Sequence, residues 1–308
     1  MIKSVFMGTP DFGLGCLEVL NNKTQVVGVV SQPDKPKGRG HKMVPTPVKA
    51  KAVELGIPVF QPETLKGEAF LETLRELDPD IIVVVAYGKL LPSYILDYPK
   101  HGCVNVHASL LPKLRGAAPI QRSIMNGDKV TGVTTMLMEK GLDTGDMLLK
   151  CEVPIADDET GGGLFEKLAD AGAELLSKTL DKIADGSIDR TPQNHDEHTY
   201  APMLDKETAR IDWSDSAENI RNLVRALNPV PLAFSVFNGK VFKIAEVEAG
   251  NLHLEAGCIG EYDKEKGVPV GCGDGCVYLK TVKPEGKGTM PIHDYVRGNS
   301  ITVGAKFE

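Results

Sequence analysis

The chain has 308 residues, of which 42% are hydrophobic and 25% are charged. This balance is ordinary for a globular protein, and the length leaves room for two domains with cores of their own. No apolar run approaches the roughly 20 residues of a membrane span and no secretory signal pattern opens the chain, so we expect a cytoplasmic protein with no membrane partner. The net charge of −7 argues against a protein that binds nucleic acid over its whole surface.

The cysteines predict neither disulfides nor a metal site. Six of them are scattered along the chain, without the spacing of a disulfide framework, so we expect reduced thiols. Cys272 and Cys276 also lack a regular zinc spacing, and we predict that the protein binds no metal.

The first elements predict a parallel, Rossmann-like sheet. Residues 2–7 form an apolar run that ends in a turn at residues 8–11, an amphipathic helix follows, and residues 25–31 form a second apolar run. A strand, turn, helix and strand in this order open such a sheet. The turn lacks the Gly-x-Gly-x-x-Gly pattern and no acidic residue ends the second strand, which disfavours an NAD-type site.

Residues 32–47 form a long connection rich in proline and glycine, which we expect to be irregular. Six basic residues but only one acid, Asp34, lie between residues 34 and 51. Such a loop is either a solvated surface segment or a functional one. The functional interpretation is a loop that contacts a polyanion through Lys35, Lys37, Arg39 and Lys42.

The run at residues 81–86 is apolar throughout, as a strand buried on both faces must be. Tyr87, Gly88, Leu90 and Leu91 follow it at the carboxyl end, where ligands bind in sheets of this kind. The plainer alternative is a strand-to-helix turn in which Gly88 supplies the bend.

The stretch at residues 102–119 carries the strongest functional signal. Residues 103–107 suit a short buried strand, which Pro112 and Gly116 cannot continue. Because side chains alternate along a strand, Asn105 and His107 share one face. An amide and an imidazole side by side can polarise a carbonyl group and handle a proton.

A turn at residues 141–146 separates two further predicted strands, at residues 130–139 and 147–153. Its carboxylates could simply cap the backbone of a hairpin. If the turn is functional, Asp143 is the acid that orients His107.

The remaining chain predicts a long helix capped by Thr160, a polar linker at residues 191–208, and a second domain. Short strands at residues 233–237, 241–247, 257–262, 268–271 and 276–282 predict a small, OB-like β-barrel. The expected domains are therefore residues 1–190 and 209–308. With 13 basic and 15 acidic residues between 205 and 308, the second domain gives little electrostatic support for nucleic-acid binding.

Four parts of the chain resemble the methionyl-tRNA formyltransferase family, and the resemblance extends over essentially the whole length. They are Phe6–Phe12, Gln32–Gly40, Asn105–Pro112 with Arg115–Ile120, and Thr131–Met136 through Gly141–Asp146. The Asn105–Pro112 segment is common to all 10-formyltetrahydrofolate-dependent transferases. The opening segment, the Gly-Arg-Gly loop and the C-terminal domain point to this branch. Lys113-Leu114 stand where the family pattern has Arg-Trp.

The resemblance implies transfer of the formyl group of 10-formyltetrahydrofolate to the α-amino group of methionyl-initiator tRNA. It places the catalytic roles on Asn105, His107 and Asp143, and the tRNA acceptor-stem contact on Arg39. Folate binding falls on the following residues: Ser109, Leu110, Leu111 and Pro112, together with the segment at Tyr87, Gly88, Leu90 and Leu91. We expect a monomer.

Two kinds of alternative remain open. One is a related enzyme that formylates an amino sugar nucleotide or glycinamide ribonucleotide, or that hydrolyses formyltetrahydrofolate. The glycinamide branch is disfavoured because Gly8-Thr-Pro-Asp lacks a glycine-serine phosphate loop. The other is a tRNA-binding module with a silent catalytic half, against which the intact Asn105, His107 and Asp143 argue.

Overall fold

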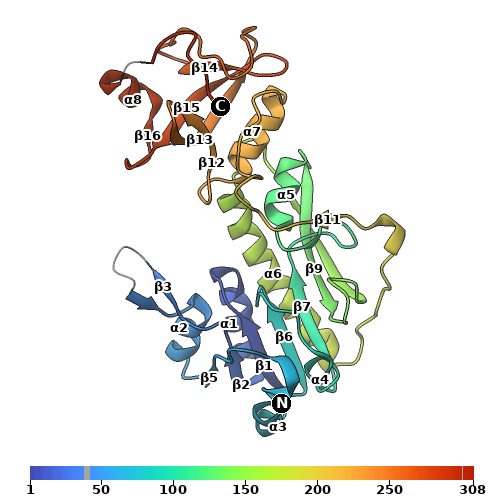
Figure 1. Ribbon diagram of the computed structural model, residues 1–308. Helices are drawn as coiled ribbons and strands as arrows, with labels where there is room; N and C mark the ends of the chain where they lie inside the picture. The colour runs from blue at the N-terminus through green and yellow to red at the C-terminus, as the bar shows by residue number, and fades with distance from the viewer. Residues whose placement is uncertain (38–41, 300) are drawn as a thin grey trace. The chain divides into compact units, whose positions relative to one another are not determined.

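The computed structural model describes residues 1–37, 42–299 and 301–308. Its contacts divide the chain into two compact units (Figure 1). The first unit comprises Met1–Ala117, Val130–Pro154 and Phe165–Ala201, and the second comprises Ala118–Lys129, Ile155–Leu164 and Pro202–Glu308. Both units are discontinuous in sequence, whereas the domains expected from the sequence are continuous.

A seven-stranded sheet forms the centre of the first unit, in the order β10-β9-β7-β6-β1-β2-β5. Its strands are β1 (Lys3–Gly8), β2 (Gln25–Val30), β5 (Val59–Phe60), β6 (Ile81–Val85), β7 (Cys103–His107), β9 (Val130–Leu137) and β10 (Met147–Pro154). Strand β9 runs antiparallel to both neighbours, and the other pairings are parallel. The mostly parallel, Rossmann-like sheet predicted from the sequence is confirmed.

Helices cover both faces of this sheet. They are α1 (Leu14–Lys23), α2 (Pro47–Glu54), α3 (Leu71–Leu77), α4 (Ser93–Leu96) and α6 (Gly161–Ala184), with short 3-10 turns at Asp11–Gly13, Lys66–Glu68 and His195–Glu197. On one face, side chains of α3 and α4 share a buried cluster with Val5, Ile82 and Cys103. On the other, Gly172 of α6 lies close to Val106 and Val133. Because β7 alternates, Asn105 and His107 lie on the face of Cys103, opposite α6.

The connection at residues 32–47 is more regular than the sequence suggested. Strands β3 (Lys35–Lys37) and β4 (Lys42–Val44) pair as a two-stranded antiparallel ribbon, with Pro36 opposite Met43. The prediction of an irregular connection was therefore wrong for these residues. A proline is tolerated in such a ribbon because alternate residues of an edge strand direct their N–H groups to solvent, where a missing N–H costs no ladder bond.

The segment expected to be a linker packs, in its first part, onto the first unit. Strand β11 (Tyr200–Ala201) pairs in parallel with β8 (Arg115–Gly116). At the other end of the segment, Thr191 exchanges two backbone hydrogen bonds with Met147, both of 2.9 Å. Residues 191–201, which we call the strap, are therefore an integral part of the unit that carries the catalytic motif.

The second unit contains an antiparallel sheet in the order β12-β13-β15-β14, with β16 paired to β15. Its elements are α5 (Pro119–Met125), α7 (Ala217–Ala226), β12 (Ala233–Phe237), β13 (Lys240–Gly250), β14 (Val268–Gly271), β15 (Cys276–Pro284), β16 (Met290–Pro291) and α8 (Ile292–Gly298). The strand predicted at residues 257–262 is wrong. Cys258 and Ile259 make only isolated bridges, to Lys306 and Val270, because Gly257 adopts a φ of +79° that interrupts the extended chain. The OB-like description stays a prediction.

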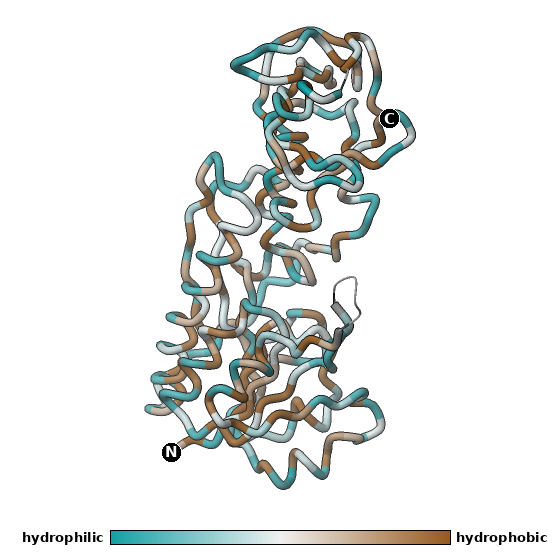
Figure 2. Tube along the Cα trace, turned by 90° about the vertical axis from the view of Figure 1, so that its left-hand side faces the viewer, coloured by the Kyte–Doolittle hydropathy of each residue, from teal (hydrophilic) through white to brown (hydrophobic). Residues whose placement is uncertain are grey.

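Each unit has its own apolar core, and hydrophobic stretches of chain occur in both (Figure 2). In the second unit the rings of Trp213 and Phe307 pack at a tilt, with centroids 5.4 Å apart. Over the described part of the chain, the helices are all too short or too polar to cross a lipid bilayer.

Candidate active site

Strand β7 presents two of the predicted catalytic side chains at the carboxyl end of the sheet. It is held on both sides, by β6 and by β9, with Asn105 opposite Val84 and Met136. Asn105 is half-buried, and only 6% of the His107 side chain is exposed. The local sequence folds this way because the apolar residues Val104 and Val106 point into the opposite face of the sheet.

The imidazole of His107 lies between two oxygen atoms. Its Nε2 is 3.0 Å from the carbonyl oxygen of Leu114, and its Nδ1 is 3.7 Å from Oδ2 of Asp143. A carbonyl oxygen can only accept, so Nε2 carries the hydrogen and the neutral ring has its lone pair at Nδ1. The ring can therefore take up a proton at Nδ1, and the resulting cation would face a carboxylate.

The carboxylate of Asp143 lies beside both of the other predicted catalytic residues. Its Oδ1 lies 3.4 Å from Nδ2 of Asn105, and its Oδ2 accepts a 2.9 Å hydrogen bond from the backbone N–H of Gly116. The Asp143 backbone has a φ of +50°, in the left-handed region. The structure thus brings Asn105, His107 and Asp143 together, although the turn itself costs some backbone strain.

The backbone of the Asp143 turn is held by Gln193, a residue of the strap. Gln193 Nε2 donates to the carbonyl oxygens of Asp143 and Gly145, both at 2.8 Å. Its Oε1 accepts from Nε and Nη2 of Arg115, at 3.1 and 2.7 Å, and that Nη2 also lies 3.2 Å from Nδ1 of His195. Sequence reasoning missed Gln193 and His195, because nothing in this polar segment distinguishes them from linker residues.

The predicted folate-binding segment after β7 is a rigid loop. Ser109 Oγ donates to the carbonyl oxygen of Lys113 at 2.6 Å, and Thr134 Oγ1 donates to that of Ser109 at 2.7 Å. Leu111 is fully buried, and its carbonyl oxygen accepts from Lys150 Nζ at 2.6 Å. Leu110 and Pro112, by contrast, are only half-buried, so their side chains are the ones within reach of a ligand.

The second predicted folate segment follows β6 and contains an unpaired polar atom. Tyr87 is 2% exposed, and its Oη has no hydrogen-bond partner among the described residues. Burial raises the pKa of Tyr87 to about 12, so the hydroxyl keeps its proton at neutral pH. Gly88 has a φ of +85°, Leu91 is buried, and Leu90 is 73% exposed.

The base of the β3–β4 hairpin is fixed by a polar cluster. Lys49 Nζ lies 2.6 Å from Asp34 and 2.7 Å from Gln61, and Gln61 donates to Asp34 at 2.7 Å. The hydrogen bond from Lys49, and then that from Gln61, lower the pKa of Asp34. Lys35 is exposed on the hairpin, Lys37 is the last residue of β3, and Lys42 is the first residue of β4. The predicted contact residue Arg39 lies outside the described residues.

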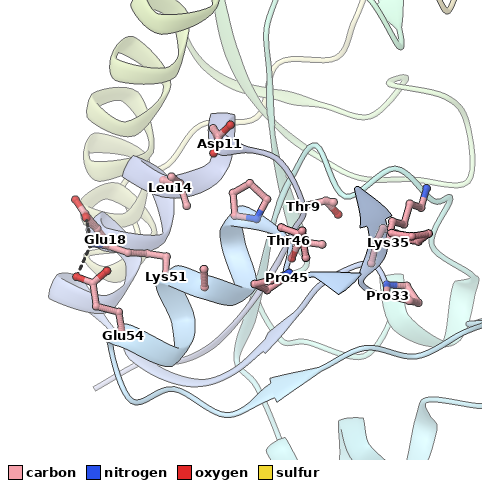
Figure 3. A pocket seen from close by; sticks show the side chains of 15 residues that line it. Thr9, Asp11, Leu14, Glu18, Pro33, Lys35, Pro45, Thr46, Lys51 and Glu54 are labelled. Carbon is pink, nitrogen blue, oxygen red and sulfur yellow. Dashed lines mark hydrogen bonds and ion pairs between the residues drawn. The ribbon is translucent and has the colours of Figure 1, made fainter. Parts of the chain in front are cut away.

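A pocket of about 750 Å³ lies beside this hairpin in the first unit (Figure 3). Prolines supply much of its wall, and Lys51 reaches between Glu18 and Glu54, at 2.7 and 3.1 Å. Thr9 and Gln32 line it and donate to the Tyr87 carbonyl oxygen, at 3.1 and 3.2 Å. The pocket is thereby tied to the carboxyl ends of β1, β2 and β6, but the side chains predicted to bind folate do not line it.

The described residues contain no group of three or more His, Cys, Asp or Glu side chains arranged to hold a metal ion. All six cysteines are free thiols. Burial raises the pKa of both Cys16 and Cys103 to about 12.

The fold is similar to that of two solved structures. An N-formyltransferase from Helicobacter canadensis, solved with folinic acid and dTDP-3-aminofucose, aligns with a TM-score of 0.69 at 21% identity, over 91% of this chain and 99% of that one. HypX from Aquifex aeolicus, solved with tetrahydrofolic acid, aligns with a TM-score of 0.63 at 17% identity, over 96% of this chain and 47% of HypX. At these identities the likeness concerns the fold alone.

Closer relatives define the family. Residues 2–180 match the family model for formyl transferases, and residues 203–300 match the model for the formyl transferase C-terminal domain. The methionyl-tRNA formyltransferase of Acetivibrio thermocellus is 48% identical over 307 residues, covering 98% of each chain. That of Clostridium perfringens is 48% identical over 306 residues, covering 98% of this chain and 99% of the relative. The chain therefore belongs to the formyl transferase family, in its methionyl-tRNA formyltransferase branch, as the sequence motifs predicted.

Proposed function

We propose that this protein transfers the formyl group of 10-formyltetrahydrofolate to the α-amino group of methionyl-initiator tRNA, giving N-formylmethionyl-tRNA for the initiation of translation. The observation that carries the proposal is the cluster of Asn105, His107 and Asp143, in a chain 48% identical over nearly its full length to proteins named methionyl-tRNA formyltransferase. We propose that residues 1–190 provide catalysis and that residues 209–308 contact tRNA, in a cytoplasmic monomer that uses no metal.

The chemistry assigned to the cluster follows from its geometry. The bound co-substrate would supply a formyl carbon that an amine can attack. Asn105 Nδ2 lies 3.4 Å from Asp143 Oδ1 and directs one of its hydrogens towards that carboxylate. The second hydrogen on this nitrogen can bind the formyl oxygen as negative charge develops there. His107 takes the amine proton at Nδ1, and Asp143 stabilises the imidazolium that results. The imidazolium then gives this proton to N10 of the co-substrate as the bond between N10 and the formyl carbon breaks, so that tetrahydrofolate leaves.

The residues that we assign to folate fit a ligand with both polar and apolar parts. The side chains that a ligand can reach are apolar, since Leu90 is 73% exposed and Leu110 and Pro112 are half-buried, whereas the unpaired Tyr87 hydroxyl lies inside a buried apolar cluster. The backbone at Gly88 and the side chains of Leu90 and Leu91 extend this segment. The loop formed by Ser109, Leu110, Leu111 and Pro112 is held in place by Thr134 and Lys150.

The tRNA contact is assigned to Lys35, Lys37, Arg39 and Lys42. Of the six basic residues between 34 and 51, Lys49 is paired with Asp34, and Lys51 with Glu18 and Glu54. The other four lie between residues 35 and 42 of the sequence, a segment that contains no acidic residue, so the positive charge is concentrated there. Phosphate contacts of this kind make binding sensitive to salt.

A single assay tests the proposal. 10-Formyltetrahydrofolate is offered with methionyl-initiator tRNA, with glycinamide ribonucleotide or with an amino sugar nucleotide, and formylated product is measured. We expect product with methionyl-tRNA and none with the other two acceptors. His107→Ala should abolish it while the protein still unfolds cooperatively, and full activity in that variant would refute the assigned site.

A further inference from the structure

The strap contacts two segments that adjoin the catalytic groups, the one after β7 and the turn that contains Asp143. Thr199 accepts two hydrogen bonds from the segment after β7. Leu114 N donates to its Oγ1 and Arg115 N donates to its carbonyl oxygen, both at 2.9 Å. Gln193 contacts the other segment, the turn that contains Asp143. A strap with these contacts does more than connect two units, because it determines the local geometry of both.

Gln193 uses its full hydrogen-bonding capacity in this position. Only 5% of the residue is exposed, and its amide makes two donor contacts to the turn and two acceptor contacts to Arg115. A primary amide has two donors and two acceptor lone pairs, so nothing is left over. A buried polar network that is fully satisfied in this way is rigid.

Arg115 fixes the direction of the amide. A guanidinium only donates, so the Gln193 oxygen must face Arg115 and the Gln193 nitrogen must face the turn. There the nitrogen binds two backbone carbonyl oxygens, including that of Asp143, whose φ of +50° is unusual for a residue with a side chain. The left-handed conformation needs support of this kind in order to persist.

We propose that Gln193 is a positioning residue for formyl transfer: it holds the Asp143 turn so that the carboxylate reaches Asn105 and His107. The proposal rests on the function proposed above. It predicts an effect on turnover that is transmitted through Asp143, since the hydrogen bonds of Gln193 within the described part of the chain go to Arg115 and to the Asp143 turn, and not to Asn105 or His107.

Gln193→Glu is the sharpest test, because a carboxylate can still accept from Arg115 but repels the two carbonyl oxygens of the turn. We expect kcat for formylation to fall by about 10- to 100-fold, with KM for 10-formyltetrahydrofolate changed less than about twofold. Asn194→Asp makes the same chemical change at the next residue, which is exposed and whose side chain hydrogen-bonds to Asp196 and Glu197 of the strap, and should leave kcat within about twofold. If the charge prevents folding, Gln193→Met preserves the length and is compared in the same way.

A double variant separates positioning from general support. In an Asp143→Asn background, Gln193→Glu should lower kcat further by less than about twofold, because the carboxylate that Gln193 positions is absent there. If Gln193→Glu lowers kcat as much in this background as it does alone, the proposal is overturned. A Gln193→Glu single variant with wild-type kcat would also overturn it. If the wild type formylates no acceptor, the proposed function fails, and crystal structures then decide the role of Gln193. A positive φ at Asp143 in Gln193→Glu would refute that role, and a relaxed turn would support it.

Discussion

Replacing Asp143 by asparagine tests how much the enzyme depends on a charged partner for His107. The substitution keeps the shape of the side chain and removes its charge. At the observed separation of 3.7 Å between Nδ1 and Oδ2, an effective dielectric constant of about 20 gives roughly 4.5 kcal/mol for the attraction between imidazolium and carboxylate. Since about 1.4 kcal/mol corresponds to a tenfold change in rate, kcat should fall by about 10³-fold.

The assay for Asp143→Asn is the initial rate of methionyl-tRNA formylation at saturating 10-formyltetrahydrofolate. KM for the co-substrate should change little, because the charge is needed only when His107 becomes protonated. Asp189→Asn, an equal charge change at an exposed position of the same unit, serves as the control and should behave as wild type. A folded Asp143→Asn enzyme with kcat within tenfold of wild type would refute the role given to the carboxylate.

Three further substitutions test the hairpin and the strap. Arg39→Ala should weaken formylation of methionyl-tRNA, less so at higher salt because salt already weakens the phosphate contact in the wild type, and should leave folate binding nearly unchanged. Equal loss of both would mean that the loop is structural. Contacts with Lys49 lower the pKa of Asp34 below its usual 3.8, so they stabilise the fold above that pH and cease to do so as pH falls through the lowered value. In urea unfolding, Asp34→Asn should therefore have a smaller free energy of unfolding than wild type at neutral pH and the same one in acid. A difference that does not change with pH would contradict this. Gly116→Ala places a methyl group 2.8 Å from the Ala201 carbonyl oxygen, at a backbone φ of +113°. It should lower the free energy of unfolding by about 1–3 kcal/mol and Tm by about 3–10 °C. An unchanged Tm would show that the strap can move away from the methyl group at no cost.

Much of the fold could be predicted because the relevant signals are local. The apolar run at residues 81–85 forms the central strand β6, and the alternating residues of β7 place Asn105 and His107 on one face. Thr160 caps α6 as predicted, with Gly163 N donating to its Oγ1 at 3.1 Å. The strand predicted at residues 257–262 failed because a periodic pattern does not reveal the left-handed backbone of Gly257.

The supporting contacts of the site could not be predicted, because their partners are far apart in sequence. Gln193 binds the Asp143 carbonyl across 50 residues, and Thr199 binds Leu114 N across 85. Neither residue belongs to a motif, and their polar surroundings are typical of a linker. Only the tertiary structure shows that this segment is folded against the catalytic turn.

The departure of Leu114 from the family pattern can be understood from the same contacts. The sequence has leucine where the resemblance drawn from the motifs leads us to expect tryptophan, yet the role of this residue beside His107 depends on its backbone. Its carbonyl oxygen accepts from His107 Nε2 at 3.0 Å, its N–H donates to Thr199 Oγ1 at 2.9 Å, and its φ of +57° directs the two groups. A change of side chain leaves both hydrogen-bonding groups in place, so the tautomer of His107 depends on the strap that holds residue 114 and not on the identity of its side chain.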